Sequence, residues 1–254
     1  MFPLKDNIPT DRTPWVTITL ILANVVVFFL QLRGGGTILE GPTTQAVVDW
    51  GVIPYEVTHP GDECAISGDN LVCGGEQGDQ PPTWVTAFSS MFMHGGILHI
   101  GGNMLFLWIF GNNVEDAMGH ARFVVFYLLG GIAAIALQTA VDLDAAVPSI
   151  GASGAVAAVL GGYLLLYPRA KVLTLVFLFV FFAFIQLPAM LFLVIWFAQQ
   201  ALFGITDLTN PTGGGGGVAY FAHIGGFLFG LATIKLFANR VHEDYERAHR
   251  TPVY

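Results

Sequence analysis

Charged residues are scarce in this chain of 254 residues: 11% are Asp, Glu, Lys or Arg, while 54% are hydrophobic. Soluble domains carry roughly 25% charged residues, so this composition excludes an ordinary soluble protein and indicates an integral membrane protein. Cysteine is equally scarce. The two cysteines, Cys64 and Cys73, leave no second pair to complete a four-ligand zinc site, so they are a reduced pair or a disulfide. A disulfide is favoured if their polar stretch faces an oxidising compartment.

Long apolar runs make up most of the chain. A helix needs about 20 apolar residues to cross ~30 Å of hydrocarbon, and six runs are candidate spans: 16–32, 96–114, 121–141, 150–167, 172–203 and 218–238. The fifth run is too long for one simple helix and short for two with a turn. We therefore expect its part before Pro188 to be an apolar segment at the inner surface or part of a tilted helix. The first run predicts a retained signal-anchor.

The positive charges predict the orientation of these spans. With six spans and a cytoplasmic N-terminus, nine of the ten Lys and Arg residues fall on the inner side, and only Arg33 falls outside. The outer loops hold eleven of the eighteen acids. This positive-inside pattern predicts an all-α membrane protein with cytoplasmic termini: an N-terminus at 1–15, a six-span domain at 16–238 with a long outer loop at 34–90, and a tail at 239–254. The five glycines at 213–217 are a linker or a mobile cap over a site.

Polar residues interrupt three of the runs near the predicted outer face. Ser153 begins the fourth span within Gly151-Ala152-Ser153-Gly154-Ala155. The other two runs contribute His99, Asn103 and His223, and His94 lies just before the second run. Polar side chains are costly in a bilayer and indicate function by default. Each feature alone also fits helix packing, but their common depth favours a nucleophile, a base and hydrogen-bond donors. The pattern predicts peptide hydrolysis within the membrane.

Missing residues narrow this chemistry. Intramembrane aspartyl proteolysis needs two carboxylates within spans, and none is present; the His-Glu-x-x-His pattern of zinc proteases is also absent. No Asp or Glu in the outer halves of the spans can orient a histidine, which favours a Ser-His dyad over a full triad. His99 and Asn103 are four residues apart and share a helix face, as an oxyanion site requires. Gly226 and Gly230 follow His223 at helical spacing and would let two spans approach closely.

These motifs resemble those of the rhomboid family of intramembrane serine proteases. The matching residues are Gly151-x-Ser153-Gly154-Ala155, His94-x4-His99-x3-Asn103 and Ala222-His223-x2-Gly226-x3-Gly230. The resemblance implies a six-helix bundle and a catalytic Ser153–His223 dyad. It also implies an oxyanion hole formed by the Ser153 amide, His99 and Asn103, with His94, Gly151, Gly154 and Gly226 in supporting positions. Substrates would enter from the lipid between spans two and five, near Trp196 and Phe197.

The expected partners follow from this interpretation. They are transmembrane protein substrates and the lipid bilayer, with no cofactor, no metal and no nucleic acid. We expect a multi-pass protein of a prokaryotic cell membrane whose active site faces the extracytoplasmic side. The alternative is a non-catalytic rhomboid-like binder or quality-control receptor, against which Ser153 and His223 argue. The sequence leaves the oligomeric state and the physiological substrate open.

Overall fold

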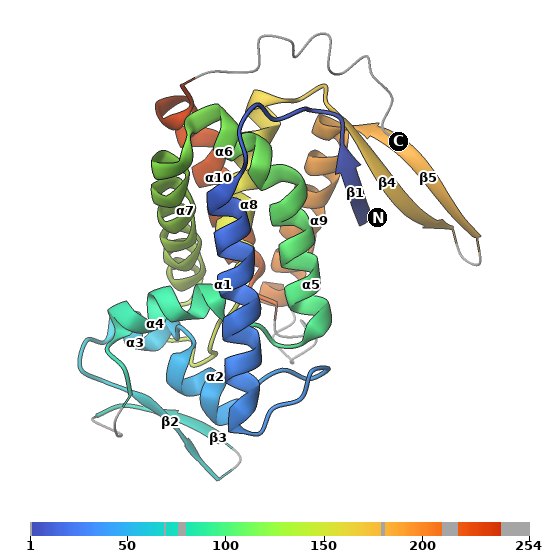
Figure 1. Ribbon diagram of the computed structural model, residues 1–254. Helices are drawn as coiled ribbons and strands as arrows, with labels where there is room; N and C mark the ends of the chain where they lie inside the picture. Colours follow the sequence, from blue (N-terminus) through green and yellow to red (C-terminus); the bar gives the residue numbers. More distant parts are fainter. Residues whose placement is uncertain (1, 69, 76–79, 179–180, 210–217, 240–254) are drawn as a thin grey trace.

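The computed structural model describes residues 2–68, 70–75, 80–178, 181–209 and 218–239. The glycine run 213–217 and all but the first residue of the expected tail 239–254 lie outside them. The described residues form a bundle of helices with small elements at both ends (Figure 1). The bundle consists of α1 (Trp15–Gln31), α5 (Ile97–Phe106), α6 (Asn112–Met118), α7 (His120–Val141), α8 (Ser153–Leu166), α9 (Ala189–Thr209) and α10 (Tyr220–Phe237).

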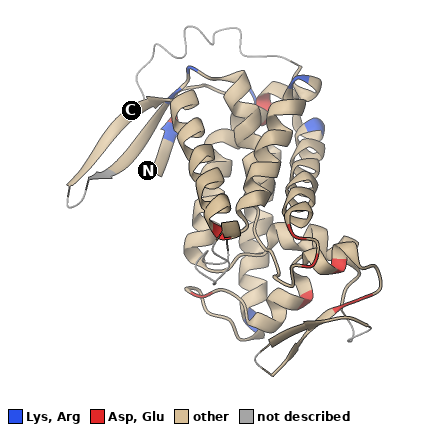
Figure 2. Ribbon diagram, turned by 180° about the vertical axis from the view of Figure 1, so that it is seen from behind, with Lys and Arg blue, Asp and Glu red and all other residues tan. Residues whose placement is uncertain are grey.

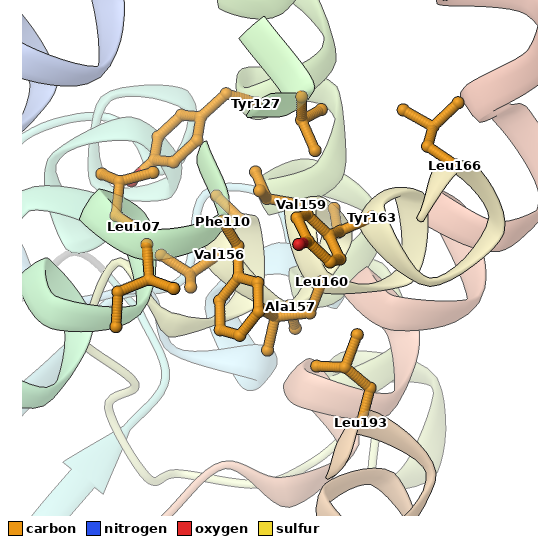
Figure 3. Packing of buried hydrophobic residues seen from close by; sticks show 14 of the residues in the cluster. Leu107, Phe110, Tyr127, Val156, Ala157, Val159, Leu160, Tyr163, Leu166 and Leu193 are labelled. Atoms are coloured by element: carbon orange, nitrogen blue, oxygen red, sulfur yellow. The ribbon is translucent and has the colours of Figure 1, made fainter. Parts of the chain in front are cut away.

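Helix α8 forms the centre of the bundle. Eleven of its fourteen residues are buried, because the other helices cover nearly all of its circumference. Figure 3 shows its side chains Val156, Val159, Leu160 and Tyr163 within the apolar core, close to Phe110. A helix that is hydrophobic on all sides suits such a fully surrounded position. The core thus holds the first residue of α8, Ser153, at one end of the bundle.

Glycines bring α8 and α10 into backbone contact. A Cβ atom at Gly226 would lie 2.0 Å from the carbonyl oxygen of Gly154, and one at Gly230 would lie 2.0 Å from that of Ala158. On α8, a Cβ at Gly161 would lie 2.1 Å from the carbonyl oxygen of Phe227. Small residues permit this approach in membrane helices. Residues at the start of the two helices can therefore reach each other with short side chains.

The end of the bundle next to Ser153 is covered by the long loop. It contains the turn η1 (Leu32–Gly34), the helices α2 (Thr44–Trp50), α3 (Pro54–Thr58) and α4 (Thr83–Ser89), the turn η2 (Ser90–Phe92) and the hairpin β2 (Cys64–Ser67)–β3 (Asn70–Cys73). A disulfide joins Cys64 to Cys73 across the paired ends of this hairpin. Val52 and Ser149 exchange backbone hydrogen bonds, which tie the loop to the segment before α8.

The opposite end carries a sheet that the sequence did not predict. Strand β1 (Phe2–Asp6) pairs with β4 (Lys171–Leu178), which pairs with β5 (Phe181–Pro188), all antiparallel. The β4–β5 hairpin projects away from the bundle (Figure 1). The all-α expectation is therefore wrong here, and the predicted run 172–203 is a hairpin followed by α9, which begins directly after Pro188. Aromatic and β-branched residues suit strands, but periodicity cannot separate a strand from a helix in a continuous apolar run.

We call the end of the bundle that carries the sheet the inner end. A buried carboxylate, Glu115, helps to hold it together. Glu115 of α6 accepts hydrogen bonds from the backbone N–H groups of Val16 and Thr17 and from the Thr17 hydroxyl, at 2.7–2.9 Å. His120 Nδ1 lies 2.6 Å from Glu115 Oε1, the oxygen that also accepts from Val16. The first N–H groups of a helix lack intrahelical partners and favour a nearby anion. Glu115 therefore caps α1 from a distant part of the chain.

Among the described residues, four helices are long and apolar enough to cross a membrane: Trp15–Gly34, α7, α9 and α10. The pair Thr83–Phe92 and Ile97–Met118, bent by 83°, makes a fifth if it counts as one span. The second segment joins α5 to α6 through the π-helical turn η3 (Leu107–Gly111). Figure 2 shows most of the described Lys and Arg residues at the inner end and acidic residues mainly at the other. The chain is thus a multi-pass membrane protein, and its charge is polarised along the bundle.

Candidate active site

Ser153 is the first residue of α8. In the loop before it, Gly151 leaves room for the imidazole of His99. Gly151 has φ +129°, a backbone conformation that side chains rarely adopt, and a Cβ there would lie 2.8 Å from His99 Nε2. Gly151 is thus required both by its backbone and by the imidazole that lies against it. The Gly154 Cβ position is 2.5 Å from the Ala134 Cβ, so α7 also packs directly behind the serine.

His223 lies opposite Ser153 in the first turn of α10. Its Nε2 atom is 2.8 Å from Ser153 Oγ, a normal hydrogen-bond distance. The Trp196 ring of α9 packs against the imidazole, with ring centroids 5.9 Å apart. The backbone contact between α8 and α10 therefore brings together a hydroxyl and an imidazole that are 70 residues apart in the chain.

A cavity of about 620 Å³ opens next to this pair. The side chains lining it include Ser153, His223, His99, Asn103 and Trp196. Asn103 Nδ2 is buried and has no hydrogen-bond partner among the described residues. An unpartnered buried donor is costly, and here it belongs to a residue that lines the cavity. The hydrogen-bonding capacity of this nitrogen is therefore unused within the described residues.

His99 presents a second donor on the same helix. The backbone N–H of Gly95 donates to His99 Nδ1 at 3.2 Å. A backbone N–H can only donate, so Nδ1 accepts, and the neutral ring carries its proton on Nε2. That nitrogen lies beside Gly151. Asn103 and His99, one turn apart on α5, thus offer two N–H donors near Ser153.

His94 is fully buried and does not line the cavity. Its Nδ1 donates to the carbonyl of Phe92 at 3.2 Å, and the backbone N–H of Ala152 donates to its Nε2 at 3.5 Å. Its ring centroid is 5.1 Å from that of His99. His94 therefore links the segment before α5 to the loop that carries Ser153, which is a supporting position.

One contact of His223 was missed from the sequence. Gln200 of α9 is buried, and its Oε1 lies 2.9 Å from His223 Nδ1. The absence of Asp and Glu led us to expect a dyad whose imidazole is fixed by packing and hydrogen bonds, but the sequence did not identify the partner. Two adjacent glutamines in an apolar run were the available signal, and the sequence does not tell which of them faces the histidine.

Trp196 and Phe197, expected between spans two and five, lie on α9. The Trp196 ring is 6.5 Å from that of Phe106 on α5, while Phe197 stacks on Phe227 of α10. Trp196 and Phe106 both line the cavity, whose wall is therefore built partly from α5 and α9. The disulfide lies in the covering loop, and neither cysteine lines the cavity.

Fold and site together define a multi-pass helical membrane protein with a hydrogen-bonded serine–histidine pair facing a cavity inside the bundle. Residues 81–240 match the model of the Rhomboid domain. The chain belongs to the rhomboid family.

Curated relatives come from bacteria and mitochondria. The chain is 35% identical over 105 residues to Rhomboid protein 1, mitochondrial, of Saccharomyces cerevisiae, covering 40% of this chain and 30% of the relative. It is 30% identical over 152 residues to Rhomboid protease GluP of Bacillus subtilis, covering 59% and 24%. It is 30% identical over 146 residues to the human Presenilin-associated rhomboid-like protein, mitochondrial, covering 56% and 35%.

The chain thus spans about a quarter to a third of the length of these relatives. Because mitochondrial proteins stand beside the bacterial one, the expected assignment to a prokaryotic cell membrane is not supported.

Proposed function

We propose that the protein is an intramembrane serine endopeptidase that cleaves transmembrane proteins with a Ser153–His223 dyad. The observation that carries the proposal is the 2.8 Å contact between Ser153 Oγ and His223 Nε2 at a cavity within an apolar bundle. A serine hydroxyl becomes nucleophilic when an adjacent base takes its proton. Family membership and a relative named as a protease support the same chemistry.

In the proposed reaction, His223 Nε2 takes the Ser153 proton while Oγ attacks the carbonyl carbon of the scissile peptide bond. The tetrahedral intermediate collapses when the imidazolium returns that proton to the leaving amine, and the C–N bond breaks. An acyl-enzyme ester on Ser153 remains. A water molecule, deprotonated by His223, then attacks the ester and releases the acid and the free serine.

The developing oxyanion needs donors that are already in place. We assign this role to the backbone N–H of Ser153, His99 Nε2–H and Asn103 Nδ2. The support is geometric: His99 Nε2 lies beside Gly151, and Asn103 Nδ2 is a buried donor without a partner. His94, Gly151, Gly154 and Gly226 would shape this site without touching the substrate.

The proposed topology has six spans: α1, the bent segment leading into α5–α6, α7, α8, α9 and α10. The concentration of Lys and Arg at the inner end supports cytoplasmic termini and a site toward the extracytoplasmic side. Helix α8 has 14 residues, which rise about 21 Å, less than the ~30 Å of hydrocarbon. With its last turn at the inner surface, its first residue would lie below the outer surface, where a cavity can admit water to the serine. Residues 16–238 would form the protease domain.

A fluorophosphonate probe tests the proposal on the detergent-solubilised protein. We expect covalent labelling of the wild type and none of Ser153→Ala. Ser149→Ala is a matched control, because Ser149 lines the same cavity and should be dispensable. Absence of labelling in the folded wild type, or labelling that persists in Ser153→Ala, would contradict the serine mechanism. The former result would favour a non-catalytic rhomboid-like binder.

A further inference from the structure

Gln200 connects the proposed base to a third helix. It lies on α9, and its side chain is 7% exposed. Its Oε1 is 2.9 Å from His223 Nδ1, and its Nε2 donates to the backbone carbonyl of Trp196 at 3.3 Å. The amide therefore makes two hydrogen bonds, one to its own helix and one to the ring that faces Ser153.

The two contacts determine which way the amide points. A backbone carbonyl can only accept a hydrogen bond, so the NH₂ group of Gln200 must face Trp196 and its oxygen must face His223. An amide oxygen can only accept, so His223 Nδ1 must carry a proton. In a neutral imidazole the other nitrogen then has a free lone pair. That nitrogen, Nε2, is the one 2.8 Å from Ser153 Oγ.

We propose that Gln200 is a positioning residue that sets the tautomer and the ring orientation of His223. It takes the place that a carboxylate has in a Ser-His-Asp triad, where the third residue holds the imidazole in the reactive tautomer. The inference rests on the proposed serine peptidase function. It adds a neutral third member to a site whose sequence lacks an acidic one.

A neutral residue suits this location. Burying a carboxylate here would require further donors to offset its desolvation, whereas an amide satisfies both of its ends with one carbonyl and one imidazole. The oxygen of its dipole still faces Nδ1–H, so the imidazolium formed during the reaction keeps its hydrogen bond. The Trp196 ring alone cannot supply this selection, because packing against a face does not distinguish the two nitrogens.

The test is a comparison of Gln200→Leu with Gln199→Leu. Gln199 is the neighbouring residue on α9 and is exposed, so its replacement controls for a change of amide to alkyl on this helix. Cleavage of a transmembrane substrate in proteoliposomes would give kcat and KM, and the fluorophosphonate labelling rate would report on the serine without substrate docking. We expect Gln200→Leu to lower kcat and the labelling rate roughly 10- to 100-fold, the effect that removing an orienting partner has on metal-ligating histidines. KM and the Gln199→Leu rates should stay within about twofold of wild type.

Gln200→Glu keeps an oxygen acceptor and should be labelled clearly faster than Gln200→Leu. Gln200→Met, which preserves the side-chain length, replaces Gln200→Leu if the latter does not fold. Rates close to wild type in a folded Gln200→Leu or Gln200→Met would overturn the proposal. So would equal losses in the Leu and Glu variants, or a change confined to KM. Failure of the serine mechanism would show separately, as loss of Ser153-dependent labelling in the wild type.

Discussion

The two ends of the bundle use buried polar groups in opposite ways. At the inner end, Glu115 is saturated by two backbone N–H groups, a hydroxyl and His120. Around Ser153 the polar side chains are hydroxyl, imidazole and amide groups, and the Asn103 donor has no partner among the described residues. A fully paired carboxylate stabilises one arrangement of the chain. Unused donors beside a cavity instead leave hydrogen-bonding capacity for a ligand or a transition state. The difference separates polar groups that hold the fold from those we propose to act in catalysis.

Removing either member of the proposed reactive pair should have the largest effect on activity. Ser153→Ala or His223→Ala should each lower cleavage of a transmembrane substrate by roughly 10⁴-fold or more, because members of a catalytic unit fail together. The thermal unfolding midpoint in detergent should stay close to wild type. Cleavage near the wild-type rate by Ser153→Ala would exclude a covalent serine intermediate.

Glu115→Ala should show the opposite behaviour at the inner end. It leaves the N–H groups of Val16 and Thr17 and the Thr17 hydroxyl without their acceptor, and each buried donor left unsatisfied costs about 1–3 kcal/mol. We expect a large drop in the thermal midpoint, with the cleavage rate per folded molecule unchanged. Rates would be normalised to the fraction that a fluorophosphonate labels. A Glu115→Ala protein with a wild-type thermal midpoint but slow cleavage would contradict the structural role of the inner end.

Asn103→Ala tests whether its side-chain donor at the cavity acts in catalysis and not in stability. Since its donor has no partner in the described part of the chain, its loss should cost little stability and lower turnover by roughly 10- to 1000-fold. KM should change little, because an oxyanion donor acts mainly in the transition state. Steady-state kinetics in proteoliposomes would separate the two parameters. An effect on KM alone would show that Asn103 binds substrate and not the oxyanion.

The smallest expected effect is the pH dependence of stability that Asp6 causes at the inner end. Burial raises the pKa of Asp6 from its ordinary value of 3.8 to about 7, against the lowering effect of its hydrogen bond from Tyr163. The folded state therefore binds this proton more tightly, and the resulting stability is present below pH 3.8 and lost as pH rises through about 7. Asp6→Asn should abolish this contribution to the pH dependence of the unfolding free energy, whose slope is up to about 1.4 kcal/mol per pH unit. Thermal midpoints of the two proteins across pH 4–8 would test it, and parallel curves would contradict it.

Much of the architecture could be predicted because the membrane imposes strong local rules. Long apolar runs predicted helices that the structure contains, and the family suggested by the motifs is confirmed by the match of residues 81–240. Because few polar residues interrupt these runs, their distances from the run ends indicated that they lie at one depth in the membrane. The structure places Ser153, His223, His99 and Asn103 around one cavity. Their catalytic roles and the count of six spans stay predictions.

Two features were missed for physical reasons that particular residues illustrate. In β4–β5 an unbroken apolar run has no period that separates strand from helix, and its stabilising partner β1 comes from the other end of the chain. For Gln199 and Gln200, neighbouring positions on a helix differ by about 100° in direction. Only the rotation of α9 within the bundle decides which amide reaches His223, and an almost uniformly apolar helix does not encode that rotation locally.

By itself, the sequence determined that the chain is a membrane protein of the rhomboid family with a small set of polar residues in its apolar runs. It could do so because the cost of placing a group in lipid depends on the local composition of the segment. Tertiary structure alone decided which of those groups meet. The backbone contact of α8 with α10 through Gly226 and Gly230 brings Ser153 to His223, and the packing of α9 brings Gln200 to the other nitrogen of the ring. Hydrogen bonds act over about 3 Å, and only the close packing of distant segments sets positions on that scale.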